Sequence, residues 1–160
     1  MLAEQEPSFG GALLWNGEKI DGLDPAVWAE SVLADLRAMP NVTILPRTTV
    51  TGYFDHNYLT AVERVEDHEA PHKRSKQQPR QRFWHIRATE VVLATGAIER
   101  PAVFPGNDRP GIMLASAVRQ YLNQFAVTPG ERVLLVTNNN SAYATALDLK
   151  AAGVAVAREG

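Results

Sequence analysis

The order of apolar and polar positions along the chain separates a helical stretch, a run of strands and a second helical part. The helical stretch lies within residues 23–39, where apolar side chains recur with helical spacing at Val27, Val32, Leu33 and Leu36. Asp24 stands at the position of an N-cap, Pro25 at the first helical position, and Pro40 ends the helix. Residues 1–22 have no such period and are rich in glycine, which predicts irregular structure.

The following apolar segments predict an antiparallel meander. The expected strands are a short one at 42–46 and longer ones at 48–54, 58–65, 82–88 and 90–95. Residues 55–57 have the composition of a tight turn, so the first two long strands are expected to form a hairpin. The polar segment 66–81 has two prolines and no apolar run, which predicts an exposed loop. Phe83 and Trp84 are expected to be core or sheet-face residues rather than a binding platform.

The last part of the chain predicts a parallel unit. Residues 104–111 have turn composition and 113–125 predict a helix, and from residue 131 onward a strand, a turn, a helix and a second strand are expected. Gly153 stands where a left-handed residue commonly follows a helix. This order is the beginning of a βαβ unit.

The sequence VVLATGAIERP, residues 91–101, joins an apolar run to nearly bare backbone. Continuous apolar runs are typical of buried parallel strands, and ligands bind where such strands end. Thr95 and Gly96 have little or no side chain, so phosphate or ribose groups can approach the backbone there. Taken alone, these residues are explained more simply by an ordinary glycine turn.

The sequence AEQEPSFGG, residues 3–11, adds a carboxylate followed by two glycines. In dinucleotide-binding folds an acidic residue closes the second strand and accepts hydrogen bonds from the adenosine ribose hydroxyls. Glu4 suits this role because its two oxygens can receive both hydroxyls. Taken alone, Glu4 is explained more simply as part of a solvated acidic start.

Composition narrows the class of protein. Apolar residues make up 45% of the 160 residues and the net charge is −2, which argues against nucleic-acid and membrane-surface partners. Without cysteine, the chain has no disulfide, thiolate nucleophile or cysteine zinc site. No apolar run approaches the ~20 residues of a membrane span, and no signal peptide opens the sequence, so we expect a cytoplasmic location.

Other candidate chemistry is weaker. His68 and His72 have a zinc-like spacing, but they lie in the expected loop without further ligands, so no metal site is expected. Asparagines at 138–140 stand where a phosphate-binding turn has its glycine fingerprint. This predicts a second Rossmann-like turn that keeps its structure but does not bind a nucleotide. No Ser-His-Asp arrangement is recognisable, and no catalytic residue is expected.

The order of these elements resembles the middle of a two-dinucleotide-domain flavoprotein. The segments EQEPSFGGALLW and TNNNSAYATALDLKAAGV, and above all the block from Pro79 to Asn123, resemble the alpha subunit of heterotetrameric sarcosine oxidase. The similarity covers nearly the whole chain. It implies an α/β fold class (α+β in this excerpt), namely part of a FAD/NAD(P)-binding Rossmann-like domain with an antiparallel β-meander and the start of a second βαβ unit.

The resemblance also implies the chemistry of the parent complex. That complex oxidatively demethylates sarcosine to glycine, transfers the one-carbon unit to tetrahydrofolate and reduces O₂ to H₂O₂. Its alpha subunit carries a non-covalent NAD, whereas FAD, FMN and tetrahydrofolate lie outside this segment. The implied partners are the beta, gamma and delta subunits and a small-molecule nucleotide, with no nucleic acid and no membrane.

Carried over by position, the resemblance implies a set of NAD-binding residues in four groups: an adenosine-ribose end, a loop beside the pyrophosphate, a backbone contact to adenine and the Ala-Thr-Gly turn. In that order they are Ala3, Glu4 and Gln5; Gly11 and Ala12; Val50; and Thr95 and Gly96. Family members often have Asp at the position of Ala3 and Thr at that of Ala12.

We expect a partial dinucleotide-binding domain with the meander over residues 1–112, and a connecting helix with the beginning of a second Rossmann-like βαβ unit over 113–160. In the family, the first strand and its glycine-rich turn precede the position of Met1. Because that turn cradles the pyrophosphate, the chain is expected to be an excerpt that binds NAD weakly or not at all and is inactive alone.

Other functions are compatible with the same residues. The segment could belong to a related flavin-dependent amine dehydrogenase, acting on an opine or hydroxyproline, or forming cyanide from glycine. It could also be a structural or assembly module whose nucleotide site is vestigial, or a small binding protein for an unrelated ligand. The sequence upstream of Met1, if it held a G-x-G-x-x-G turn, would favour the nucleotide assignment.

Overall fold

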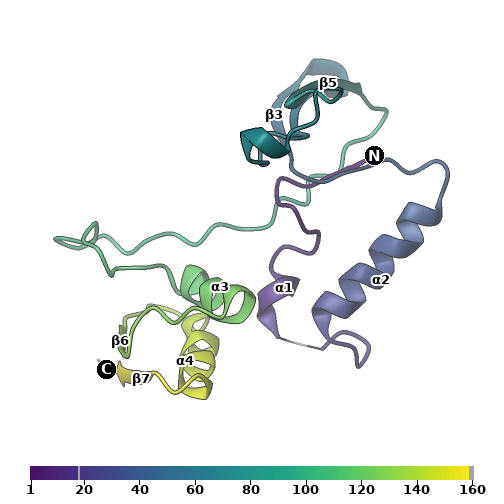
Figure 1. Cartoon of the computed structure of the whole chain (residues 1–160). Coiled ribbons are helices and arrows are strands. Elements are labelled where there is room, and N and C mark those ends of the chain that lie inside the picture. The colour runs from purple at the N-terminus through teal and green to yellow at the C-terminus, as the bar shows by residue number, and fades with distance from the viewer. Residues whose placement is uncertain (18, 159–160) are drawn as a thin grey trace. The chain divides into compact units, whose positions relative to one another are not determined.

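The computed structural model describes residues 1–17 and 19–158, which form two compact units. Unit 1 comprises Met1–Gly11 and Ala26–Thr95, and unit 2 comprises Ala12–Pro25 and the chain from Gly96 onward. The chain therefore passes between the units three times, and each unit contains sheet and helix (Figure 1). The division into a partial dinucleotide-binding domain, 1–112, and the beginning of a second unit, 113–160, stays a prediction.

The centre of unit 1 is an antiparallel sheet of three strands in the order β3-β4-β5, as predicted. Its strands are β3 (Thr48–Phe54), β4 (Tyr58–Arg64) and β5 (Gln81–Arg87). Leu59 and Ala61 on β4 are buried and lie opposite Ile86 and Trp84 on β5, so one face of the sheet forms the core. The turn between β3 and β4 is a short 3-10 segment, Asp55–Asn57, that reverses the chain.

A second, very short sheet in unit 1 places the N-terminus. β1 (Leu2–Ala3) pairs in parallel with β2 (Ile44–Leu45), and Leu45 is buried. Between them in the sequence lies the predicted helix, α2 (Pro25–Ala38), which begins at the proline expected at its first position. The pairing of β1 sets the path of the residues that follow it, including Glu4.

The strand predicted at 90–95 is wrong. Residues 88–114 form neither helix nor strand, and the apolar side chains of Val92 and Leu93 are 89% and 65% exposed. A strand of this apolar type is held by ladder hydrogen bonds to neighbours on either side. None of the strands β1–β7 in the described residues pairs with it, so the apolar run alone does not produce a strand.

Unit 2 contains the predicted βαβ unit and the predicted helix before it. β6 (Arg132–Leu135) and β7 (Ala155–Arg158) pair in parallel, α4 (Ala142–Ala151) connects them, and α3 (Ala115–Phe125) packs against α4. Val118, Leu149 and Val154 form the core. A further short helix, α1 (Leu13–Asn16), contacts α3. The prediction of irregular structure over residues 1–22 was therefore wrong at α1 and at β1.

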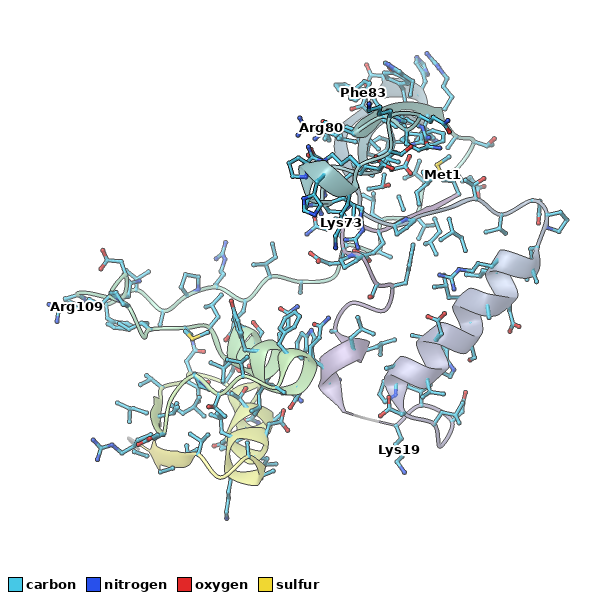
Figure 2. The ribbon with its side chains drawn as sticks, in the orientation of Figure 1. Met1, Lys19, Lys73, Arg80, Phe83 and Arg109 are labelled. Atoms are coloured by element: carbon cyan, nitrogen blue, oxygen red, sulfur yellow. The ribbon has the colours of Figure 1, made fainter. Side chains whose placement is uncertain are left out.

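The segment between β4 and β5 is exposed, as predicted, but it has an ordered internal structure. The guanidinium of Arg74 donates hydrogen bonds to the backbone oxygens of Glu66, Asp67 and Glu69, and a short 3-10 segment, Pro71–Lys73, precedes it. Figure 2 labels Lys73 and Arg80 in this loop. Because one cation satisfies three carbonyl groups, the loop keeps a compact shape without apolar residues.

The helices in the described residues are short. None of them is long and apolar enough to cross a membrane.

Candidate nucleotide-binding site

Glu4 lies at the end of β1, where backbone hydrogen bonds hold it on both sides. Its N–H donates to the oxygen of Leu45 at 3.0 Å, and its own carbonyl accepts from the N–H of Thr48 at 2.7 Å. Its carboxylate Oε1 accepts a hydrogen bond from the N–H of Glu6 at 3.0 Å. Within the described residues Oε2 has no hydrogen-bond donor, so the carboxylate is oriented and keeps acceptor capacity for a ligand.

Ala3, Gln5 and Val50 lie in the same part of unit 1 as Glu4. Ala3 pairs with Leu45, and the carbonyl of Gln5 accepts a hydrogen bond from the Arg64 guanidinium at 3.1 Å. Val50 follows two residues after Thr48 on β3, and its side chain is 46% exposed. The structure therefore brings the four residues of the predicted adenosine end onto adjoining segments.

Gly11 and Ala12 connect the N-terminal loop to α1. Gly10 and Gly11 have φ of 124° and 51°, backbone conformations that residues with a Cβ rarely adopt. A Cβ built on Gly11 meets no atom within 4 Å, so backbone conformation, not crowding, requires the glycine. Ala12 is the N-cap residue of α1 and accepts the first hydrogen bond of that helix from Trp15.

Thr95 and Gly96 lie in the exposed segment between β5 and α3. Gly96 has φ of 70°, which turns the backbone sharply after Thr95, and a Cβ there would meet nothing within 4 Å. The bare backbone predicted from the sequence is present. The strand that was expected to lead into it is not.

The eight predicted NAD-binding residues fall into both units. Ala3, Glu4, Gln5, Gly11, Val50 and Thr95 belong to unit 1, and Ala12 and Gly96 belong to unit 2. The chain passes from one unit to the other at 11/12 and at 95/96, so each predicted loop contributes one residue to each unit. The approach of Glu4 to Gly96 at one sheet edge stays a prediction.

In the turn between β6 and α4, which contains the asparagines at 138–140, side chains of the turn accept hydrogen bonds from its own backbone N–H groups. The N–H of Asn139 donates to Thr137 Oγ1 at 3.2 Å, and the N–H of Ser141 donates to Asn139 Oδ1 at 2.9 Å. Phosphate-binding turns offer such N–H groups to the ligand. The turn between β6 and α4 thus lacks two of the donors that a pyrophosphate needs.

A polar cluster in unit 2 was not predicted from the sequence. Arg119 donates to Asp148 Oδ2 at 2.7 Å and to the side-chain and backbone oxygens of Asn16, both at 3.0 Å, and its guanidinium lies over the Trp15 ring. Asn123 also donates to Asp148. Beside the cluster lies an open hollow of about 260 Å³. The sequence pattern around Arg119 does not indicate that it binds Asn16, which lies more than a hundred positions away.

Metal ligation has no support in the described residues. Within 1–17 and 19–158, no group of three or more His, Asp or Glu side chains is placed to hold a metal ion. His68 and His72, the pair with zinc-like spacing, lie in the exposed loop.

Comparison with known proteins gives three curated relatives that match almost the whole chain. It is 48% identical over 159 residues to the sarcosine oxidase alpha subunit of Corynebacterium sp. (strain P-1), and 47% identical over 156 residues to that of Rhizobium meliloti (strain 1021). Both matches cover 98% of the chain, which spans only 16% of the length of these relatives. No family model matches the sequence.

Two further matches are more distant. An opine oxidase subunit of Agrobacterium tumefaciens (strain Ach5) is 39% identical over 69 residues, which is 43% of the chain and 14% of that protein. A crystal structure of L-proline dehydrogenase from P. horikoshii has a TM-score of 0.73 and 24% identity, covering 98% of the chain and 29% of that structure. This likeness supports the predicted α/β fold class. Over 98% of its length, then, the chain is related to one segment of the sarcosine oxidase alpha subunits.

Proposed function

We propose that the chain is a nucleotide-binding segment of a sarcosine oxidase alpha subunit, with NAD as the nucleotide. The observation that carries the proposal is the 47–48% identity to three such subunits over 98% of the chain. In the parent complex, of which the complete protein would be one subunit, we expect oxidative demethylation of sarcosine to glycine, with the one-carbon unit passing to tetrahydrofolate and O₂ reduced to H₂O₂. FAD, FMN and tetrahydrofolate would bind outside this segment.

The role of each residue in the proposed site follows from its chemistry. The oriented carboxylate of Glu4 would accept hydrogen bonds from the ribose hydroxyls, since Oε2 has no donor within the described residues. The bare backbone at Gly11 and Gly96 would allow close approach of the pyrophosphate. Ala3, Gln5, Ala12, Val50 and Thr95 would line the site, and the chain itself would supply no catalytic group.

The two parts of the chain are proposed to have different roles. Residues 1–112 would belong to the dinucleotide-binding domain, and 113–160 would begin a second Rossmann-like unit. The side-chain bonds that occupy the N–H groups of Asn139 and Ser141 support a purely structural role for the second turn. The beta, gamma and delta subunits are the proposed partners of the complete protein.

Titration of NAD into the full-length protein that carries this sequence tests the proposal. Glu4→Gln should weaken NAD binding about tenfold or more, because a hydrogen bond to a charged acceptor contributes about 1.5–3 kcal/mol. Glu6→Gln is the matched control, since Glu6 contributes its backbone N–H to Glu4 and its side chain is exposed. Equal affinities of the wild type and Glu4→Gln would contradict the assignment. For the isolated chain we expect weak or no binding, and micromolar affinity would overturn that expectation.

A second candidate is a component of a related amine-oxidising enzyme, which the 39% identity to the opine oxidase protein supports. Assaying the full-length protein, co-expressed with its partner subunits, with sarcosine, an opine and hydroxyproline distinguishes the candidates. Oxidation of sarcosine alone would support the first proposal. Activity restricted to another amine would favour the second, and NAD binding would be a separate result.

A further inference from the structure

The β3-β4-β5 sheet has two very different faces. One carries the buried residues Leu59 and Ala61 and forms the core of unit 1. Another set of side chains lies together on the opposite face. Phe54 pairs with Tyr58, and Tyr58 pairs with Arg87. His85 and Phe83 lie two and four residues before Arg87 on β5, so they point to the same face as Arg87. We call this set the aromatic face: Phe54, Tyr58, Phe83, His85 and Arg87.

The aromatic face exposes large rings where an exposed sheet face is ordinarily polar. The solvated side of a one-sided antiparallel sheet normally carries polar residues. Here Phe54 and Phe83 are 56% and 55% exposed, and Figure 2 labels Phe83 on the sheet. Contiguous exposed aromatic residues of this kind mark interaction surfaces in folded proteins.

The rings of the aromatic face are ordered by contacts with one another. Phe83 and His85 meet edge to face at 4.9 Å between centroids, His85 and Tyr58 stack at 6.0 Å, and Tyr58 and Phe54 meet at 5.8 Å. The Tyr58 hydroxyl and His85 Nδ1 share a hydrogen bond, and Arg87 lies over the Tyr58 ring at 5.5 Å. A preordered surface loses little side-chain entropy on binding.

The charges on this side of the sheet identify the chemistry of the partner. Arg64 pairs with Gln81 on the same side of the sheet, but its guanidinium donates to the carbonyl of Gln5, so the basic side chains of the aromatic face are Arg87 and His85. Among the strand residues of that face in the described chain there is no carboxylate, since Glu63 lies on the other face and bonds Arg82 and Trp84. Tyrosine, phenylalanine and arginine are typical of the central residues of protein interfaces, and complementarity requires an acidic partner.

A protein partner fits better than a nucleic acid or an anionic membrane. Binding to a polyanion draws on an extended basic surface, because each neutralised phosphate contributes. The aromatic face has one arginine, Arg87, and the net charge of the chain is −2. A short acidic and apolar polypeptide segment can pair its few carboxylates with the basic side chains of this face.

We propose that the aromatic face docks an acidic, apolar segment of another subunit of the oxidase complex. This inference rests on the proposed function, because the relatives are named as subunits. Phe83 and Phe54 would insert between apolar side chains of the partner, and Arg87 would pair with a partner carboxylate. The aromatic face shares no residue with the proposed NAD site.

The test uses the full-length protein, expressed with and without its partner subunits, and measures the dissociation constant of their complex. Phe83→Ser and Arg87→Glu should each weaken binding of the partner subunits about tenfold or more. Tyr143→Ser and Arg100→Glu are matched controls, because they remove an exposed aromatic ring and an exposed arginine outside the face. The controls should change binding less than about twofold. Amide hydrogen exchange of β4 and β5 verifies that each variant keeps its meander.

Several outcomes would overturn the inference. Unchanged affinity for the partner subunits in Phe83→Ser and Arg87→Glu would contradict it. Protection of Arg87 from phenylglyoxal in the protein without its partner subunits would also contradict it, because the same chain would then cover the face. Binding of a poly(dT) oligonucleotide or of phosphatidylserine vesicles that Arg87→Glu abolishes would replace the protein partner with a polyanion.

Titration of NAD in the same samples separates the two proposals. Loss of affinity for the partner subunits in these variants, together with an absence of NAD binding in the wild type, would support the docking surface alone. NAD binding with unchanged affinity for the partner subunits would support the nucleotide site alone.

Discussion

Arg119 on α3 donates a hydrogen bond from Nε to Oδ2 of Asp148 on α4, at 2.7 Å, and this pair joins the two helices of unit 2. The side chains are only 11% and 27% exposed. Arg119 also bonds both oxygens of Asn16, so the same guanidinium ends α1. One cation thus connects α1, α3 and α4 through polar contacts.

Arg119→Met should destabilise unit 2 by about 2–3 kcal/mol, because it leaves Asp148 and the carbonyl of Asn16 partly unpaired in a half-buried place. Amide hydrogen exchange of α3 and α4 measures the loss locally. Asp148→Asn should cost less, since an amide oxygen can still accept from Arg119 and Asn123. Arg132→Met, at an exposed position on β6, is the control, and an equal loss there would argue against the role of the cluster.

The carboxylate of Glu99 caps α3 from a distant part of the chain. Its Oε2 accepts a hydrogen bond from the N–H of Ser116 at 2.8 Å, and Leu114 at the N-cap position has no side chain that can do so. Glu99→Ala should therefore raise the exchange rate of the first amides of α3, with a loss of about 1 kcal/mol. Glu131→Ala serves as control for loss of an exposed acid, and the prediction fails if both variants behave alike.

Periodicity predicted those parts of the fold that are stabilised by contacts close in sequence. The meander, α2, α3 and the βαβ unit each show their own apolar period, and the structure contains all of them. The strand at 90–95 failed because its stability depends on neighbouring strands, which its own residues cannot reveal. β1 and α1 are two and four residues long, too short for any period.

The candidate site was predictable in its backbone and unpredictable in its side-chain contacts. Two glycines and a Thr-Gly step predicted nearly bare backbone, and the structure adds that Gly11 and Gly96 have positive φ. The order of strands did not reveal that Glu6 orients Glu4, or that Arg64 holds the carbonyl of Gln5. Those hydrogen bonds depend on how the N-terminal segment packs against β3 and β4, and local sequence patterns do not predict that packing.

Asp67 makes the loop between β4 and β5 sensitive to acid. Hydrogen bonds from the side chains of Arg80 and then Gln81 lower the pKa of Asp67 below its ordinary value of 3.8. Because the folded-state pKa is depressed, the stabilisation is present above pH 3.8 and is lost as the pH falls from there to the folded-state pKa. We expect the loop amides to lose protection only in that acidic range.

Carboxyl-carbon NMR titration of Asp67 and hydrogen exchange of the loop test this prediction. Asp67→Asn should remove the acid-dependent part of the protection, because the asparagine does not titrate. Asp108→Asn, an exposed acid in unit 2, should leave the loop's pH dependence unchanged. A titration of Asp67 at or above pH 3.8 would contradict the proposed effect of the Arg80 bond.

Gly52 leaves room on the sheet for the ring of Phe54. It follows the register shift after Val50, and a Cβ built there would lie 2.6 Å from Phe54 Cζ and 2.9 Å from Thr60 Oγ1. Gly52→Ala should therefore displace the Phe54 ring and destabilise the β3-β4 hairpin by about 1–2 kcal/mol. Because Phe54 belongs to the aromatic face, the same substitution should also weaken the proposed contact with the partner.

A double-mutant cycle separates the clash from a general effect of alanine in a strand. In a Phe54→Ala background, Gly52→Ala should cost less by about 0.5–1 kcal/mol, since the ring that it meets is absent. Gly130→Ala is the matched control, because a Cβ there meets nothing within 4 Å. Urea unfolding and amide exchange of β4 give the free energies. If Gly52→Ala costs the same in both backgrounds, the Phe54 ring is not what the glycine accommodates.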